Sequence, residues 1–254
     1  MTPRRPEDRR TVASVTVVGA GRLGRSLSRA LSEAGVTVFG PTHRGEQAPE
    51  ADVVMVCVPD AEIAAAVREH RSAANLIGQV SGATPLAGSG ADFGLHPLQT
   101  FTGDEGLSDF AGIGCAVAGR SPEALDVARE LAETLGARPF PISDADRAAY
   151  HAAASLASNY LVTLEDAAGR LAATAGLEPD DARTLLAPLV RRTVENWAAL
   201  GSLRALTGPV ARGDEQTVAR QRAAVAERTP DLVELFDALT ARTRALVAST
   251  EEAP

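Results

Sequence analysis

Two histidines stand where an imidazole could take part in acid–base chemistry. His96 is followed by Pro97, which favours extended backbone at the preceding residue, so we expect its imidazole at the end of a strand. His151, Ser155 and Asn159 follow one another at helical spacing and would share one face of a helix. We take His96, His151 and Asn159 as candidate catalytic residues, although a structural histidine and a solvated polar face would look the same in sequence.

The chain has 25 basic residues, all of them arginine, and it contains no lysine. An arginine guanidinium keeps its proton throughout the working pH range, so it binds anions well but is a poor general acid. Proton transfer must therefore use a carboxyl, tyrosine, cysteine, bound water or one of the four histidines, which are His43, His70, His96 and His151.

Two polar segments are candidates for binding a small carboxylate substrate. Ser81 and Gly82 follow an apolar run and offer a hydroxyl and a backbone N–H, although a tight turn would also explain them. The loop 206–214 carries Thr207 and Arg212, and the arginine would clamp a carboxylate or pair with Asp214 instead. The predicted substrate-binding residues are Ser81, Gly82, Ser155, Thr207 and Arg212.

A glycine-rich loop follows the first strand-forming run. The spacing G-x-G-x-x-G places Gly19 at a tight turn, Gly21 where backbone approaches a pyrophosphate, and Gly24 where the next helix packs on the strand. An amphipathic helix ending at Gly35 and a second strand follow, which makes the motif typical of dinucleotide binding. The loop residues are Gly19, Ala20, Gly21, Arg22, Leu23 and Gly24.

The residues after the second strand favour NADP(H) over NAD. An NAD-preferring protein usually has an acidic residue there, whereas this chain has Thr42, His43 and Arg44, with its first carboxylate at Glu46. These groups, assisted by Arg22, would bind a ribose 2′-phosphate. Val58, Pro59 and Asp60 follow the third strand and would lie near the nicotinamide ribose, or form a simple turn capped by Asp60. No Cys/His spacing indicates a metal site.

The order of apolar runs predicts the fold class. Strand-like runs at 15–18, 36–39, 53–58, 76–80, 93–95 and 113–117 alternate with helical stretches, which indicates a doubly wound parallel sheet of the Rossmann type. From 144 onward only helical patterns occur, with boundaries at Pro179, Gly201 and Thr229-Pro230. We expect a flexible tail (1–11), a Rossmann NADP-binding domain (12–142) and an all-α substrate and dimerisation domain (143–254).

One apolar stripe, typical of a core or dimer interface, comprises Leu185, Leu186, Leu189, Val190, Val194 and Trp197.

The composition excludes several classes of protein. With 254 residues, 45% of them hydrophobic, the chain can bury a full core. Its formal charge of −8 argues against nucleic-acid binding, which needs clustered positive charge. The apolar run after the polar N-terminus is too short for a signal segment or a membrane span, so we expect a cytoplasmic protein that binds no membrane.

Together these motifs resemble those of a family of Rossmann-type oxidoreductases whose helical C-terminal half long had no assigned function, and some of whose members are an alternative type of ketopantoate reductase. The resemblance covers nearly the whole chain. Its segments are 19–24, 58–60, 81–83, H-P-L-Q-T-F at 96–101 and L-T-G-P-V-A-R-G-D at 206–214, the last two being family-specific. The wider group includes 6-phosphogluconate, β-hydroxyacid, pyrroline-5-carboxylate and prephenate dehydrogenase-type enzymes. Its members commonly dimerise through the helical half, which implies a homodimer here.

One departure from that group concerns the catalytic lysine. Ordinary ketopantoate reductases and many β-hydroxyacid dehydrogenases use a lysine on the first helix of the second domain, with an asparagine on the same face. His151 occupies a comparable place here and Asn159 would be the amide. The His96-Pro97 element also resembles prephenate dehydrogenases, in which the matching histidine serves catalysis.

The resulting hypothesis is NADPH-dependent reduction of a small 2-oxo acid, 2-dehydropantoate (ketopantoate) to pantoate. His96 or His151 would donate the proton, Asn159 and Ser81 would orient the carbonyl, and Arg212 would hold the carboxylate. Two alternatives remain open. One is a related NADP-dependent oxidoreductase acting on prephenate, an imine or a deazaflavin, and the other is a non-catalytic NADP(H)-sensing protein whose helical half binds a partner.

Overall fold

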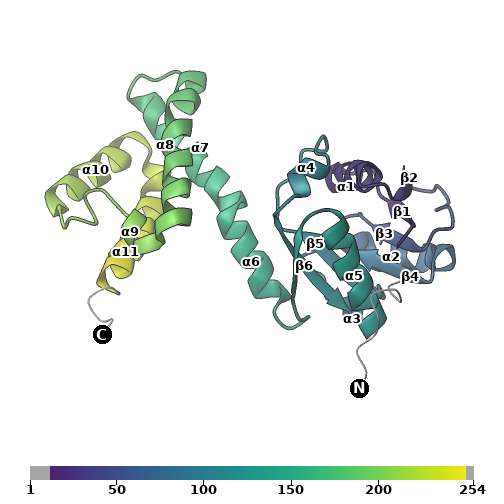
Figure 1. Cartoon of the computed structure of the whole chain (residues 1–254). Coiled ribbons are helices and arrows are strands. Elements are labelled where there is room, and N and C mark those ends of the chain that lie inside the picture. The colour runs from purple at the N-terminus through teal and green to yellow at the C-terminus, as the bar shows by residue number, and fades with distance from the viewer. Residues whose placement is uncertain (1–11, 250–254) are drawn as a thin grey trace. The chain divides into compact units, whose positions relative to one another are not determined.

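The computed structural model describes residues 12–249, and the predicted flexible tail, 1–11, lies outside the described residues. These residues form two compact units, the first ending at Ser158 and the second beginning at Asn159 (Figure 1). No helix in the described part of the chain is long and apolar enough to cross a membrane.

The first unit is built on one sheet of seven strands in the order β2-β1-β3-β4-β5-β6-β7. The strands are β1 (Ser14–Val18), β2 (Thr37–Thr42), β3 (Val53–Val56), β4 (Leu76–Gln79), β5 (Phe93–Pro97), β6 (Gly114–Gly119) and β7 (Arg138–Pro141). Strands β1 to β5 are parallel, β6 runs antiparallel to β5, and β7 is parallel to β6. The carboxyl ends of the first five strands therefore share one edge of the sheet.

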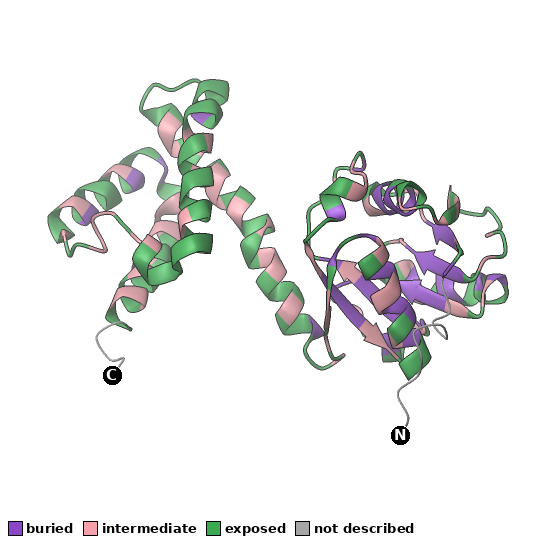
Figure 2. Ribbon diagram, in the orientation of Figure 1, coloured by how far each residue is buried: buried purple, intermediate pink, exposed green. Residues whose placement is uncertain are grey.

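Helices cover both faces of this sheet (Figure 1). They are α1 (Arg22–Glu33), α2 (Ile63–Glu69), α3 (Leu86–Ser89), α4 (Leu107–Phe110) and α5 (Pro122–Thr134), with 3₁₀ turns at Asp60–Glu62 and Arg71–Ala73. Helix α6 (Arg147–Ala157) follows β7 and buries only Arg147. Alternation along β3 divides the core: Val53 and Met55 pack with α1, α4 and α5, whereas Val54 and Val56 pack with α2 and α3. Figure 2 shows this buried layer along the strands.

The predicted fold class is confirmed, with two additions that the sequence pattern did not indicate. Strands β6 and β7 reverse the direction of the sheet. Strand β7 reads R-P-F-P, and proline lacks the N–H that a central strand needs. It is tolerated here because β7 is an edge strand that pairs with β6 alone.

The division between the units falls one helix later than the predicted boundary at 142. Helix α6 belongs to the first unit because its first residue, Arg147, is almost fully buried there with 2% of its surface exposed. Arg147 bonds to Asp144 and to the backbone of Ser81, which ties the start of α6 to the end of β4.

The second unit is helical. It contains α7 (Asn159–Thr174), α8 (Pro179–Leu200), α9 (Ser202–Ala205), α10 (Glu215–Arg228) and α11 (Val233–Ala248), with a 3₁₀ turn at Pro230–Leu232. Pro179 begins α8 and Gly201 follows its end, as predicted. Only five of its described residues are buried, and these are Ala182, Val218, Val225, Thr229 and Thr240 (Figure 2).

Candidate functional site

The glycine loop lies at the point where the chain changes direction across the sheet. After β1 the chain forms β2 on one side, and β3 then pairs with β1 on the other. In open α/β sheets, ligands bind at the carboxyl ends of the strands at such a point. Gly19 has φ +106° and abuts the segment after β3, because a Cβ at Gly19 would lie 2.4 Å from the carbonyl oxygen of Cys57. This places Val58, Pro59 and Asp60 beside the glycine loop.

The third glycine permits a second close approach. A Cβ on Gly24 would lie 1.9 Å from the carbonyl oxygen of Gly19, so only glycine lets α1 begin so near the end of β1. Leu23 packs against the core, whereas Arg22 is exposed. The Ala20 carbonyl accepts a hydrogen bond of 3.1 Å from Arg25.

Gly21 faces open space. No heavy atom lies within 4 Å of a Cβ built on it, and it is the N-cap of α1, with no side-chain cap and no acidic residue in the first turn. The first N–H groups of a helix carry partial positive charge and bind anions. The loop therefore leaves an unobstructed anion site at the α1 N-terminus, which is the cradle that a pyrophosphate requires.

The residues after β2 differ from the expectation in two respects. The Thr42 hydroxyl is buried and has no hydrogen-bond partner among the described residues, so it faces the interior rather than a ligand. Two carboxylates also lie closer to Arg44 and His43 than the sequence indicates. Arg44 donates to Glu62 at 2.6 Å, and the His43 N–H donates to Glu46 at 2.6 Å. The Arg44–Glu62 pair is exposed and contributes little stability, so a phosphate could displace the carboxylate.

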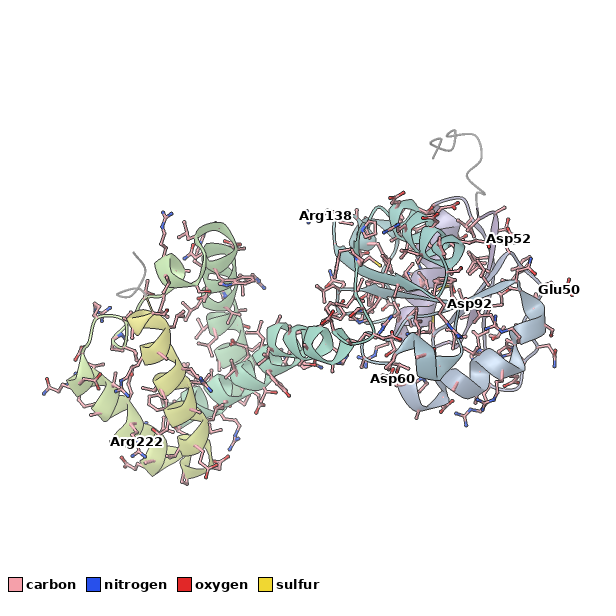
Figure 3. All side chains as sticks on the ribbon, turned by 90° about the horizontal axis from the view of Figure 1, so that it is seen from below. Glu50, Asp52, Asp60, Asp92, Arg138 and Arg222 are labelled. Carbon is pink, nitrogen blue, oxygen red and sulfur yellow. The ribbon has the colours of Figure 1, made fainter. Side chains whose placement is uncertain are left out.

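Ser81 and Asp60 form a hydrogen-bonded turn at the same edge of the sheet. The Ser81 hydroxyl donates to the Asp60 carboxylate at 2.9 Å and accepts from the N–H groups of Ala83 and Thr84. Figure 3 shows Asp60 in the first unit. Because the single donor of the serine is already used, Ser81 shapes the loop after β4 and would have to leave Asp60 to bind a substrate.

His96 lies at the end of β5, as predicted, and α6 brings a tyrosine to it. The Nδ1 atom of His96 is 2.7 Å from the Tyr150 hydroxyl, and the two rings meet edge to face at 90°. The hydroxyl and ring of Tyr150 therefore fix both the position and the plane of the imidazole.

The second predicted histidine lies nearby on the same helix. The ring centroids of His96 and His151 are 6.2 Å apart. A Cβ on Gly82 would lie 3.0 Å from Nε2 of His96 and 2.9 Å from Cδ2 of His151, so glycine is needed between the two rings. The structure thus brings His96, His151 and Gly82 together.

Arg147 is a buried cation beside this group. Its Nε bonds Asp144 at 2.9 Å and its Nη1 bonds the Ser81 carbonyl oxygen at 3.1 Å, while Nη2 has no partner among the described residues. A Cβ on Gly94 would lie 2.8 Å from Nη2, so β5 accommodates the guanidinium only because residue 94 is glycine. Burying a charge is costly unless it is paired, which accounts for the Asp144 contact.

The surroundings keep His96 neutral. Burial, followed by the charge interactions with His151 and Arg147, lowers the pKa of His96 from 6.5 to about 4 against the opposing effect of Asp60. Burial also raises the pKa of Tyr150 to about 12. At neutral pH the pair is therefore a neutral imidazole and a neutral phenol, and His96 holds no proton of the kind an imidazolium donates.

The loop after His96 is attached to α1. Glu105 accepts hydrogen bonds from the Thr102 N–H at 2.7 Å and from the Ser26 hydroxyl at 2.7 Å, which lower the pKa of its carboxyl. Glu33 of α1 accepts from the Leu107 N–H at 2.7 Å. Residues 98–107 are therefore held beside the helix whose N-terminus forms the anion site.

Other predicted site residues lie outside this group. The helix carrying His151 is interrupted at Ser158, where φ −124° and ψ −74° leave the helical region. Ser155 remains on α6, but Asn159 begins α7 in the second unit, so the prediction of one continuous helical face was wrong.

Thr207 and Arg212 are exposed in the second unit between α9 and α10, and Asp214 caps α10 through the Thr217 N–H instead of pairing with Arg212.

Sequence reasoning missed Arg147 and Tyr150. In the segment R-A-A-Y-H the arginine resembles any surface residue, and nothing local indicates burial. A usable signal was the spacing of three and four residues from Arg147 to Tyr150 and His151, which places all three on neighbouring faces of a helix.

Within residues 12–249, no group of three or more His, Cys, Asp or Glu side chains could hold a metal ion.

The sheet order, glycine loop and helical second unit define a Rossmann-fold protein with a separate all-α unit. The chain belongs to the family described as a domain of unknown function, DUF2520, whose model matches residues 113–243. No curated protein matches the sequence.

Three solved structures share the fold. A Bacteroides fragilis protein described as a "putative NADP oxidoreductase" is 22% identical, with a TM-score of 0.75 over 92% of this chain and 99% of its own. A Thermotoga maritima protein is 23% identical, with a TM-score of 0.74 over 94% of this chain and 100% of its own. The imine reductase of Myxococcus stipitatus in complex with NADP⁺ is 18% identical, with a TM-score of 0.59 over 93% of this chain and 94% of its own.

The neutral state of His96 predicts a pH-dependent stability. Between about pH 6.5 and pH 4, the unfolded chain binds a proton at His96 that the folded protein does not. The free energy of unfolding should therefore fall as the pH falls through this window, with a contribution from His96 of up to about 3 kcal/mol. Urea denaturation at pH 7 and pH 4 of the natural protein and His96→Gln measures this contribution, because other titrating groups are common to both. Equal pH dependence in the two proteins would contradict it.

Proposed function

We propose that this protein is an NADP-dependent reductase whose reaction takes place at the carboxyl edge of the sheet. One observation carries the proposal: the open anion site of the glycine loop and the half-buried His96–Tyr150 pair lie at the ends of parallel strands of one sheet. In folds of this type, ligands bind at that edge. The imine reductase that shares the fold was solved with NADP⁺, which agrees with the proposal.

The residues of the glycine loop would hold the cofactor. Gly21 and the first N–H groups of α1 would bind the pyrophosphate, and Arg44, His43 and Arg22 would bind the ribose 2′-phosphate. Val58, Pro59 and Asp60 would line the nicotinamide side. When bound, NADPH supplies the hydride, and the protein binds, orients and protonates the substrate.

The proposed substrate is a small 2-oxo acid, with ketopantoate as the first candidate because of the motif resemblance. The Nε2 atom of His96 would bind the carbonyl oxygen, with His151 beside it. Asn159 would orient the carbonyl, and Arg212 with Thr207 would hold the carboxylate. An imine is the second candidate, since a solved structure with this fold is an imine reductase.

We also propose a homodimer formed through the helical unit. The predicted apolar stripe of α8 is not in the core of the unit, because Leu185, Leu189 and Trp197 are 61%, 63% and 57% exposed. So much exposed apolar surface on a unit with five buried residues is typical of an interface.

Sedimentation velocity at micromolar concentration should therefore give a dimer, and Leu189→Asp should shift it to a monomer. A buried charge without a partner weakens an apolar interface by several kcal/mol. Far-ultraviolet circular dichroism serves as the test of folding, because Leu189 lies on a helix of the second unit. A monomeric natural protein would rule out the dimer.

The glycine loop gives a test of the cofactor. Gly21→Ala should fold normally, because the added Cβ meets no atom of the protein. It should raise the Kd for NADPH at least tenfold, because that space is where the pyrophosphate would lie. NADPH fluorescence titration measures this, with Gly88→Ala as a control at another glycine whose Cβ would meet no neighbour. Unchanged affinity, or tighter binding of NADH than of NADPH, would contradict the assignment.

Turnover with ketopantoate tests the substrate. Loss of nicotinamide absorbance should require His96, and His96→Ala should lower kcat by at least about 10²-fold with little change in NADPH affinity. Arg212→Ala should raise KM, whereas Arg204→Ala, which removes another exposed arginine of the second unit, should not. If NADPH binds tightly and ketopantoate is not reduced, cyclic imines are tested next. Full activity of both His96→Ala and Arg212→Ala would exclude the proposed site.

A further inference from the structure

The His96–Tyr150 pair joins two elements that are distant in sequence. The Nδ1 atom of His96 on β5 lies 2.7 Å from the hydroxyl of Tyr150 on α6. The Tyr150 ring also meets the ring of Phe140 on β7 edge to face, with the two ring centroids 5.9 Å apart. Tyr150 thus contacts the rings of both His96 and Phe140, and its hydroxyl is directed at one nitrogen of the imidazole.

The hydrogen bond determines which imidazole nitrogen carries the proton. A neutral imidazole has one donor and one acceptor nitrogen, and that acceptor is a stronger base than a phenol oxygen. Burial raises the pKa of Tyr150, so its hydroxyl keeps its proton and can donate to Nδ1. In that arrangement the N–H of His96 would be on Nε2, the atom that lies beside Gly82.

A neutral His96 needs a proton supply if it is to protonate an alkoxide. With a pKa of about 4, only about one imidazole in a thousand is charged at pH 7. Donation by the imidazolium would use this rare form alone. The common form carries a single proton on Nε2 and has the Tyr150 hydroxyl bonded to its other nitrogen.

We propose that Tyr150 is the proton source of the reaction and acts through His96, an inference that rests on the proposed reduction of a carbonyl. As the hydride reaches the carbonyl carbon, the Nε2–H bond of His96 breaks and an O–H bond forms on the substrate oxygen. The Oη–H bond of Tyr150 breaks and an Nδ1–H bond forms. This leaves His96 neutral with its proton on Nδ1 and leaves Tyr150 as a phenolate. The starting state is restored when the Nδ1 proton returns to the Tyr150 oxygen and Nε2 takes a proton from solvent.

The direction of this transfer is favourable. An aliphatic alcohol is a weaker acid than a phenol, so the proton moves downhill from Tyr150 to the developing alkoxide. The buried charge of Arg147 lowers the pKa of Tyr150 against the larger effect of burial, and so favours the phenolate. The other groups that face the pair are His151 on α6, Asp60 after β3 and Cys115 on β6, whose thiol is neutral because burial raises its pKa to about 12.

The first experiment reads the tautomer of His96 in the free protein. Two-bond ¹H–¹⁵N correlation at pH 7 should show Nε2 protonated and Nδ1 unprotonated in the natural protein, and mixed tautomers in Tyr150→Phe. Assignment uses His96→Gln. An Nδ1–H tautomer in the natural protein, or an unchanged tautomer in Tyr150→Phe, would overturn the proposal without any reference to substrate.

The second experiment separates proton supply from a structural role. Tyr150→Phe keeps the ring packing and should lower kcat about 10²-fold with little change in KM or NADPH affinity. Its kcat should also rise as the pH falls from 8 to 6 relative to the natural protein, because only the imidazolium can then donate. Tyr160→Phe, which changes the only other tyrosine, an exposed residue on α7, should behave like the natural protein.

The two experiments also distinguish the two proposals. If no 2-oxo acid or imine is reduced, the proposed function has failed, and the tautomer measurement still decides whether Tyr150 sets the state of His96. If reduction occurs and Tyr150→Phe has the rate and pH profile of the natural protein, the proton supply by Tyr150 is wrong and the proposed function stands.

Discussion

The burial of one guanidinium determines how the candidate site is assembled. Arg147 is 2% exposed, and its only described partners are Asp144 and the Ser81 carbonyl. Asp144 also accepts from the N–H groups of Leu86 and Ala87 at the start of α3. The ion pair therefore connects the ends of β4, α3 and α6. One helical turn later, the position of α6 brings Tyr150 and His151 to His96.

The same arginine influences the chemistry. Burial is the largest cause that keeps His96 neutral, and the charge of Arg147 adds to it because a second positive charge nearby is unfavourable. The same charge makes the Tyr150 phenolate less costly, against the larger effect of burial. Lysine is absent from the chain, so no ammonium group can supply the proton. In the proposed proton transfer, a neutral imidazole backed by a phenol would take the place that the sequence resemblance gives to a lysine.

The sequence predicted what depends on local pattern. Gly19, Gly21 and Gly24 were assigned correctly as a tight turn, an open approach and a close helix contact, since each depends on a missing Cβ and a fixed spacing. His96 at a strand end followed from Pro97 alone. The helical spacing of Arg147, Tyr150 and His151 was visible in the sequence, but the burial of Arg147 was not, because it depends on a gap left by Gly94 more than fifty residues earlier. The approach of Glu62 to Arg44 was likewise invisible, since it depends on how the segment after β3 folds back.

The two units differ in how far they bury their apolar side chains. They also carry different parts of the proposed site. In the first unit, strand alternation and the helices on both faces bury most large apolar side chains fully or in part. In the second unit, α7 has no buried residue and α8 buries only Ala182. Helices with so little buried surface gain little stability from their own packing. Asn159, Thr207 and Arg212 all belong to this unit, whereas the glycine loop and the His96–Tyr150 pair belong to the first unit. The proposed cofactor site can therefore be tested independently of the proposed substrate contacts and the proposed dimer.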